Sequence, residues 1–176
     1  MIKRAVFLDR DGVICKEKNL FYGGKPILRP EDFEWIYGSK TALRELKELN
    51  FKTFVVTNQS SISKGILNFK QFMRINQPII EEHPEIHFYC CPHRREENCS
   101  CRKPKIKFLL QAKKEHGVSL EDSYVIGDKT QDILMGKNAG CKTILVRTGY
   151  GGRDELYKVK YDFEVRDFLE AVRFLR

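Results

Sequence analysis

The chain has 176 residues, the size of one ordinary domain with a single hydrophobic core. Its hydrophobic fraction of 41% and aromatic fraction of 11% are typical of a globular protein, and the lack of Pro/Gly/Ser tracts or like-charge blocks excludes a disordered chain. The formal net charge of +8 favours anionic partners, either phosphorylated metabolites or nucleic acid, without choosing between them, and a solvated Lys/Arg surface would also account for it.

The first apolar segment, Ala5–Leu8, is a predicted strand and is too short for a signal peptide or a membrane span. We therefore expect a cytoplasmic protein without a membrane partner. In that compartment the six cysteines are interpreted as thiols or metal ligands, not as a disulfide framework.

Predicted strands and helices alternate along the chain. Short apolar runs, rich in β-branched and aromatic residues, predict buried strands at residues 5–8, 53–57, 86–90, 124–126 and 143–146. Apolar stripes with helical spacing predict helices at residues 39–49, 69–80, 106–116, 130–139 and 167–175. Ser39 is the expected N-cap of the first helix, and residues 16–29 are expected to form a loop.

This alternation predicts an α/β fold with a Rossmann-like parallel sheet and helices on both faces, because parallel neighbours need a crossover. We expect a single domain over residues 1–176, with no stretch between the motifs long enough for a separate cap domain. Ligands bind such sheets at the carboxyl ends of the strands. Asp9, Thr57, Cys91 and Asp128 are predicted to lie there.

Two carboxylates follow the first predicted strand, in the motif Asp9-Arg10-Asp11-Gly12-Val13. One carboxylate could attack phosphorus while the other transfers a proton, and a divalent cation would reduce their repulsion of an anionic substrate. Gly12 permits a tight turn at this point. Such a pattern also occurs in turns and helix caps without a catalytic role.

A second acidic pair, Asp128 and Asp132, follows the predicted strand at residues 124–126. Oxygen ligands from two strand ends would suit Mg²⁺. Asp132 has another interpretation, because an acidic residue in the first turn of a helix is stabilising without any catalytic function.

Two further segments could bind a phosphate group. Thr57 and Asn58 supply a hydroxyl, an amide and backbone N–H groups at a third strand end. Arg102 and Lys103 supply fixed positive charge just before a predicted helix. Alone, each segment would be an ordinary polar loop or a solvated basic turn.

Four residues within a stretch of eleven could bind zinc: Cys91, His93, Cys99 and Cys101. Three thiolates and one imidazole fill a tetrahedral structural Zn²⁺ site with no open position. The polar segment 94–98 has no core of its own, so a metal would stabilise it. The ligand pairs are closer than in usual zinc fingers, which leaves a redox-active or disulfide pair as an alternative. Cys90 is expected to be a buried strand residue, and Cys15 and Cys141 have no nearby partner.

The ordered motifs DRDGV, TNQS, CRKP and GDKTQD, followed by VRTG, resemble those of the haloacid dehalogenase superfamily of aspartate-nucleophile phosphatases. Within that superfamily the chain is most similar to the heptose 1,7-bisphosphate phosphatases and the histidinol-phosphate phosphatases. The heptose phosphatases carry a similar C-x-H and C-x-C loop before RKP, which favours the zinc interpretation.

The resemblance implies a role for each matching residue. Asp9 would be the nucleophile, Asp11 the general acid and base, and Lys103 the cation that bridges Asp9 and the phosphate. Thr57 and Asn58 would bind phosphate, Arg102 would contact the substrate, and Lys129 would support the site. Mg²⁺ would be held by Asp9, the backbone carbonyl of Asp11, and Asp128.

The expected partner is a small phosphorylated metabolite, and the first hypothesis is a monomeric D-glycero-D-manno-heptose 1,7-bisphosphate 7-phosphatase. Histidinol-phosphate phosphatase is the alternative, because that family shares nearly every motif. TNQSS and the residues after RKP depart from the heptose pattern, which bears on the substrate and not on catalysis. A polynucleotide 3′-phosphatase and a zinc-stabilised nucleic-acid-binding module are further hypotheses. Nucleic acid is disfavoured because the sequence shows no aromatic-basic stacking platform.

Overall fold

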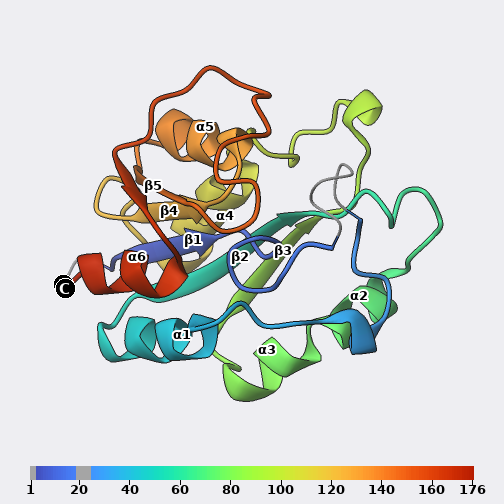
Figure 1. Ribbon diagram of the computed structural model, residues 1–176. Helices are drawn as coiled ribbons and strands as arrows, with labels where there is room; N and C mark the ends of the chain where they lie inside the picture. The colour runs from blue at the N-terminus through green and yellow to red at the C-terminus, as the bar shows by residue number, and fades with distance from the viewer. Residues whose placement is uncertain (1–2, 19–24) are drawn as a thin grey trace.

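The computed structural model describes residues 3–18 and 25–176. Its centre is one six-stranded sheet in the order β3-β2-β1-β4-β5-β6, with every neighbouring pair parallel (Figure 1). The strands are β1 (Ala5–Leu8), β2 (Lys52–Asn58), β3 (His87–Cys91), β4 (Tyr124–Gly127), β5 (Lys142–Val146) and β6 (Phe163–Val165).

Helices cover both faces of the sheet (Figure 1). One face carries α1 (Ser39–Glu48), α3 (Gln77–Glu82) and α6 (Phe168–Phe174), and the other carries α4 (Lys107–His116) and α5 (Thr130–Ala139). The predicted α/β fold with helices on both faces is confirmed.

Strand β1 shows why the sheet needs two layers of helices. All four of its side chains are fully buried, and they alternate between the two faces. Val6 and Leu8 pack in the core under α1 and α6, whereas Ala5 and Phe7 pack in the core under α4 and α5. A strand buried on both faces appears in the sequence as a continuous apolar run.

The strand register brings the predicted site segments to one edge of the sheet. Leu8 of β1 pairs with Val55 of β2 and with Ile126 of β4. The residues that follow, Asp9 and Asp128 among them, therefore leave the sheet at the same edge.

Three local expectations need correction. The helix predicted over residues 69–80 is two helices, α2 (Phe69–Ile75) and α3, because Asn76 ends the first and Pro78 lies in the first turn of the second. Ser39 does not cap α1: Gly38 is the N-cap with φ of 82°, and the Ser39 hydroxyl donates to the carbonyl of Val13. The sequence analysis does not predict strand β6. Its three residues are partly buried, exposed and partly buried in turn, so they form no buried apolar run.

Two short 3-10 helices, η2 (Pro30–Asp32) and η3 (Arg95–Glu97), complete the described elements. The loop predicted at residues 16–29 falls partly outside the described residues, which omit 19–24. Among the helices of the described segments, none has the length and apolarity that crossing a membrane would need.

Candidate active site

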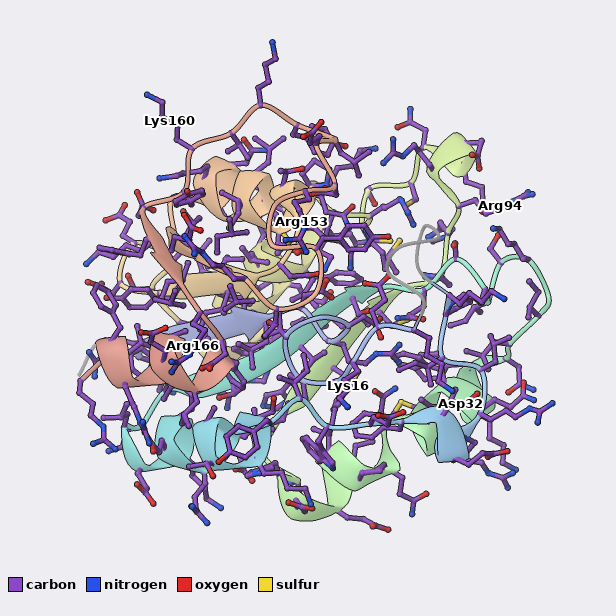
Figure 2. The ribbon with its side chains drawn as sticks, viewed as in Figure 1. Lys16, Asp32, Arg94, Arg153, Lys160 and Arg166 are labelled. Atoms are coloured by element: carbon purple, nitrogen blue, oxygen red, sulfur yellow. The ribbon has the colours of Figure 1, made fainter. Side chains whose placement is uncertain are left out.

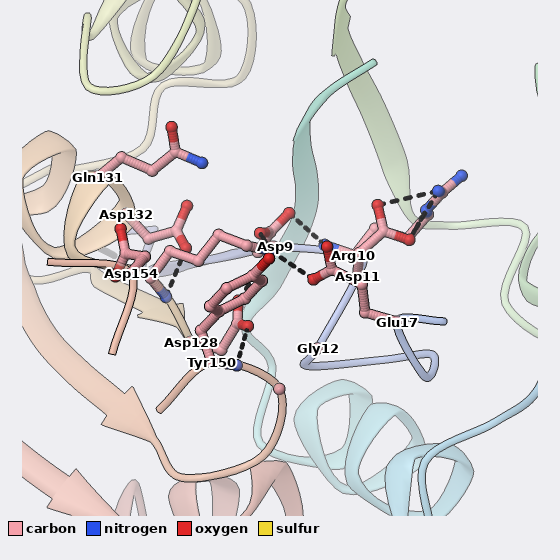
Figure 3. A network of polar contacts seen from close by, with 12 residues as sticks. Asp9, Arg10, Asp11, Gly12, Glu17, Asp128, Gln131, Asp132, Tyr150 and Asp154 are labelled. Atoms are coloured by element: carbon pink, nitrogen blue, oxygen red, sulfur yellow. Dashed lines mark hydrogen bonds and ion pairs between the residues drawn. The ribbon is translucent and has the colours of Figure 1, made fainter. Parts of the chain in front are cut away.

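Three carboxylates meet at the carboxyl edge of the sheet. Asp9 follows β1, Asp128 follows β4, and Asp132 lies in the first turn of α5 (Figure 3). They are 5%, 0% and 1% exposed, and each offers an oxygen within 4.8 Å of the other two. Burying three negative charges this closely is unfavourable unless cations compensate them.

Two lysines provide part of that compensation. The ammonium of Lys103 lies 2.9 Å from Asp9 Oδ1 and 2.7 Å from Asp132 Oδ1, and it also donates to the carbonyl of Val56 at 2.9 Å. The ammonium of Lys129 lies 3.6 Å from Asp128 Oδ1 and 3.9 Å from Asp9 Oδ2. Lys129 also lies 2.8 Å from Glu17, so these two ammonium groups face more carboxylates than they can neutralise, and negative charge is left over.

The pKa values of these groups reflect the crowding. Burial, reinforced by the charges of its acidic neighbours, raises the pKa of Asp128 well above its ordinary value. Burial also raises the pKa of Asp132 to about 6, although Lys103 acts in the opposite direction. Burial alone would lower the pKa of Lys103, but attraction by Asp132 and Asp9 outweighs it and raises that pKa.

The carboxylate cluster fits a divalent cation. Among the described residues, Asp128 Oδ1 is a fully buried oxygen that accepts no hydrogen bond, although it is close to Lys129. Three carboxylate oxygens with uncompensated negative charge are the hard ligands that Mg²⁺ prefers. We expect a cation here to take up the free oxygen of Asp128.

Glycines allow the backbone to approach Asp128. Gly12 has φ of +89°, and a Cβ built on it would lie 2.3 Å from Asp128 Oδ2. A Cβ on Gly149, at φ of +59°, would lie 2.1 Å from the same oxygen. That oxygen accepts the backbone N–H of Tyr150 at 2.8 Å, so only glycines leave room for this arrangement (Figure 3).

The carboxylate of Asp11 lies apart from this cluster. It forms a bidentate pair with Arg10, whose Nη2 is 2.7 Å from Oδ1 and 2.9 Å from Oδ2 (Figure 3). Burial would raise the pKa of Asp11, but the charge and hydrogen bonds of Arg10 prevail and lower it. The third carboxylate of the cluster therefore comes from Asp132 and not from Asp11. The predicted metal contact of Asp11 is through its backbone carbonyl, so the position of its side chain does not test that prediction.

A cavity of about 510 Å³ opens over Asp9. Its walls include the predicted site residues Asp11, Thr57, Asn58, Arg102, Lys103 and Lys129. Glu17 and Gln59 also line it. Gln59 belongs to the TNQS motif but has no role of its own in the sequence analysis, and Glu17 lies in the segment expected to be a loop. Glu17 accepts a 2.8 Å contact from Lys129, and burial raises the pKa of Glu17.

Two of the predicted phosphate-binding residues already have partners in the chain. Asn58 Oδ1 accepts the backbone N–H of Lys103 at 3.1 Å, which ties the end of β2 to the basic segment. Thr57 Oγ1 accepts Gln59 Nε2 at 2.9 Å. Arg102 donates to the carbonyl of His93 at 2.9 Å, so its guanidinium is held between the cavity and the cysteine-rich loop.

Cys91, His93, Cys99 and Cys101 form a second potential metal site. The three sulfur–sulfur distances are 3.3, 3.6 and 3.6 Å, and His93 Nδ1 lies 3.7 Å from Cys91 Sγ and 3.4 Å from Cys101 Sγ. A tetrahedron with zinc–sulfur bonds of about 2.3 Å has sulfur–sulfur edges of about 3.8 Å, close to this spacing. The set therefore fits a tetrahedral zinc ion with no open position.

The remaining cysteines are free thiols, as the sequence indicates. Cys15 and Cys141 are buried, and Cys90 in β3 is partly buried and lies outside the four-ligand cluster. The ammonium of Lys105 contacts the carbonyls of Asn98 and Cys99 at 3.2 and 2.5 Å, which joins the cysteine-rich loop to the segment that carries Lys103.

Asp132 is the residue whose role the sequence understated. Its Oδ2 accepts the backbone N–H of Lys129 at 3.2 Å, as expected for a residue near a helix start. Its other oxygen holds Lys103. The motif Gly127-Asp128-Lys129-Thr130-Gln131-Asp132 could have suggested this, since Asp132 lies in the first turn of the helix that begins directly after Asp128 and Lys129.

Comparison with known proteins relates this geometry to a family. A family model described as HAD-hydrolase-like matches residues 100–171. A D-glycero-beta-D-manno-heptose-1,7-bisphosphate 7-phosphatase of Helicobacter pylori is 42% identical over 149 residues, which cover 81% of this chain and 83% of that protein. A D-glycero-alpha-D-manno-heptose-1,7-bisphosphate 7-phosphatase of Campylobacter jejuni is 35% identical over 151 residues, covering 83% of each.

Among solved structures, the D,D-heptose 1,7-bisphosphate phosphatase of B. bronchiseptica, in complex with magnesium and phosphate, has a TM-score of 0.87. The matched region covers 98% of this chain and 97% of that protein, with 22% sequence identity. The two proteins therefore share the same fold. The chain belongs to the haloacid dehalogenase-like phosphatases, and it is a phosphoric monoester hydrolase.

Proposed function

We propose that this phosphatase removes the 7-phosphate of D-glycero-D-manno-heptose 1,7-bisphosphate through an aspartyl-phosphate formed on Asp9. The observation that carries the proposal is the position of Asp9, which lines the 510 Å³ cavity while Lys103 lies 2.9 Å from its Oδ1. A nucleophilic carboxylate needs such a cation, because phosphoryl transfer brings further negative charge to it.

The surrounding residues support this chemistry. Lys103 would neutralise charge on both Asp9 and the phosphoryl oxygens, and Asp132 holds Lys103 in place at 2.7 Å. Thr57 and Asn58 would present donors to the phosphate. Asp11 would protonate the departing sugar oxygen and later accept a proton from water.

Mg²⁺, held by Asp9, Asp128 and the backbone carbonyl of Asp11, would supply the positive charge that lets an anionic substrate approach buried carboxylates. The free oxygen of Asp128 supports this assignment. Asp132 is the additional carboxylate close to this site.

Basic residues at the cavity support a substrate with two phosphates. Lys25, Lys64 and Arg102 line the cavity in addition to Lys103 and Lys129. One phosphate would lie over Asp9 and the second would have cations within the same cavity. The names of the relatives include both anomers, so the anomer preference is best measured by comparing the two substrates.

We further propose that Cys91, His93, Cys99 and Cys101 bind a structural Zn²⁺, which would hold Arg102 and Lys103 at the cavity. The protein is proposed to act in the cytoplasm as a monomer, in one domain without a cap. Access to the site would then depend on loops, including residues 60–64 and 147–153.

The test of the substrate compares kcat/KM with Mg²⁺ for the two heptose bisphosphate anomers, histidinol phosphate and a 3′-phosphorylated oligonucleotide. The highest value for one of the heptose bisphosphates would support the proposal. The highest kcat/KM for histidinol phosphate would favour a histidinol-phosphate phosphatase. The highest kcat/KM for the oligonucleotide would favour a nucleic-acid phosphatase.

Replacing the nucleophile tests the mechanism. Asp9→Asn is expected to lower turnover by at least about 10⁴-fold while the fold stays intact, because the amide cannot form the covalent intermediate. Circular dichroism would check folding, and mass spectrometry of the quenched wild-type enzyme would look for phosphate on Asp9. Near-normal turnover by the variant would reject the assignment.

A further inference from the structure

The carboxylate of Asp11 is surrounded by hydrogen-bond donors of this chain. Arg10 contacts Oδ1 through Nε at 3.1 Å and through Nη2 at 2.7 Å, and its Nη2 also lies 2.9 Å from Oδ2. Gln59 Nε2 donates to Oδ2 at 2.9 Å. The thiol of Cys15 lies 3.6 Å from Oδ1. An ionised carboxylate has about four acceptor positions, so these donors occupy nearly all of them.

Arg10 is a fixed partner of Asp11. Its side chain is fully buried, and its Nη1 lies 3.5 Å from Asn76 Oδ1. Its guanidinium carbon lies 5.5 Å from the ring centre of Phe72. A buried guanidinium that lost its carboxylate would be an unpaired charge in a poorly solvated place, which is strongly unfavourable. We therefore expect Arg10 to keep its contact with Asp11 throughout the reaction.

Gln59 is an exchangeable partner. Its Nε2 also donates to Thr57 Oγ1 at 2.9 Å, and its backbone N–H donates to the carbonyl of Cys91 at 2.7 Å. If the bond to Asp11 opens, one N–H of the amide keeps its bond to Thr57, and the other is released at the cavity that Gln59 lines, where solvent or substrate can accept it. A neutral amide also binds a carboxylate less strongly than a guanidinium does.

We propose that Arg10 is a positioning residue for Asp11. It holds the carboxylate through Oδ1, by Nε and Nη2. Once Gln59 and the longer Nη2 contact release Oδ2, that oxygen exchanges a proton with the leaving group. Asp11 and Gln59 both line the cavity over Asp9, which places this exchange where the substrate would lie. The inference rests on the proposed function, in which Asp11 is the general acid and base.

The proton balance is closed over one turnover. The cycle starts with Asp11 protonated on Oδ2. An oxygen of Asp9 bonds to phosphorus as the bond from phosphorus to the sugar oxygen breaks, and the sugar oxygen takes the proton from Asp11 Oδ2. Water then attacks phosphorus and gives a proton back to Asp11, while the bond to Asp9 breaks and phosphate leaves. Both carboxylates return to their starting states.

The test uses substrates that differ in their need for the proton. A sugar alkoxide is a poor leaving group without protonation, whereas p-nitrophenolate leaves readily without it. Arg10→Lys keeps the charge and loses the bidentate contact. We expect it to lower kcat/KM for heptose bisphosphate about tenfold, and for p-nitrophenyl phosphate less than about threefold. The loss is smaller than the roughly 10²- to 10⁴-fold of general acid catalysis itself, because the acid is misplaced and not removed.

Arg166→Lys is the matched control, because Arg166 also contacts the aspartate that follows it, at 3.1 Å, on the exposed surface. It should leave both substrates unchanged. In an Asp11→Asn background, Arg10→Lys should cause little further loss, since the two residues act as a unit. Equal losses for both substrates, or full additivity with Asp11→Asn, would overturn the inference.

Two further results distinguish a failure of the proposed role of Asp11 from a failure of the inference about Arg10. If Asp11→Asn leaves the preference between the two substrates unchanged, the general acid role within the proposed function is wrong. If Arg10→Lys fails to fold, a crystal structure of the wild-type protein with Mg²⁺ and vanadate decides. The inference requires Asp11 Oδ2 to lie near the apical oxygen of the vanadate, while the Arg10 guanidinium contacts Asp11 Oδ1 and the Gln59 amide contacts Thr57 Oγ1. Any other arrangement of Arg10 and Asp11 rejects it.

Discussion

Asp132 shows how one side chain can serve a helix and a candidate active site together. One oxygen accepts the backbone N–H of Lys129 at the start of α5, and the other lies 2.7 Å from the ammonium of Lys103. Lys103 is 3% exposed, so its position depends on its two carboxylate partners and the carbonyl of Val56. The contact between Asp132 and Lys103 therefore controls where the positive charge lies.

Asp132→Asn tests this control. We expect kcat/KM to fall about 10²-fold, the size of effect seen when one group that stabilises developing charge is removed. The Mg²⁺ concentration for half-maximal activity should rise, because a carboxylate near the proposed metal is lost. Glu34→Gln, which removes the exposed contact with Lys16, is the control and should have little effect. If the Asp132→Asn variant has the same kcat/KM and the same Mg²⁺ dependence as the wild type, Asp132 does not have this role.

At the scale of elements, strand β3 and helix α4 meet through two histidines. The rings of His87 and His116 have centres 4.3 Å apart. Burial is the largest effect that lowers the pKa of each, and the charge of Lys52 acts in the same direction on both. His116 lowers the pKa of His87 further, Lys3 lowers that of His116, and Glu115 opposes these effects.

This pair predicts a pH dependence of stability. Because the folded-state pKa values lie below the ordinary value of 6.5, the unfolded chain binds more protons as the pH falls past 6.5. The free energy of unfolding should therefore decrease from pH 7.5 towards pH 5. Urea denaturation of His87→Gln/His116→Gln should show a weaker decrease than the wild type. Identical pH profiles for the two proteins would show that the pair makes no contribution.

The loop between β3 and α4 carries the proposed zinc site. We expect about one zinc per chain in protein purified under reducing conditions, since four ligands saturate a tetrahedral ion. Cys99→Ser should lose the metal and lower kcat/KM, because Arg102 and Lys103 directly follow the loop. Cys90→Ser, outside the cluster, should retain zinc. Metal analysis that finds no zinc in the wild type would reject the site.

For the molecule as a whole, the net charge of +8 is not confined to the cavity. Figure 2 shows Arg94 and Lys160 projecting from different sides of the molecule. Within the cavity, Lys25, Lys64, Arg102, Lys103 and Lys129 concentrate positive charge around the candidate nucleophile. Such a site attracts anions over a distance comparable to the Debye length, about 10 Å at 0.1 M salt.

This charge predicts a salt effect on substrate binding. Raising the salt concentration from about 0.05 to 0.5 M should increase KM for a bisphosphate roughly three- to tenfold, with kcat nearly constant. A monophosphate such as p-nitrophenyl phosphate should show a smaller increase in KM. Steady-state kinetics over this range checks the expectation, and a salt-independent KM for the bisphosphate would contradict it.

The fold and the family follow from local patterns in the sequence. Strand β1 is buried on both faces, so its apolar run identifies it without knowledge of its neighbours. Alternation with helices then implies a parallel sheet, and polar motifs at the strand ends mark the edge where ligands bind. The family resemblance, which the structure and the relatives confirm, needed only the order and spacing of those motifs.

Other features depend on contacts between distant parts of the chain, which no local pattern records. The partnership of Lys103 with Asp132 joins residues from different loops, and the bond from Gln59 to Asp11 joins the ends of β2 and β1. Strand β6 is too short and too exposed to be recognised before β5 is there to pair with it. The partners of each buried charge are the groups that come within a few ångströms of it, so they are decided only when the chain has folded.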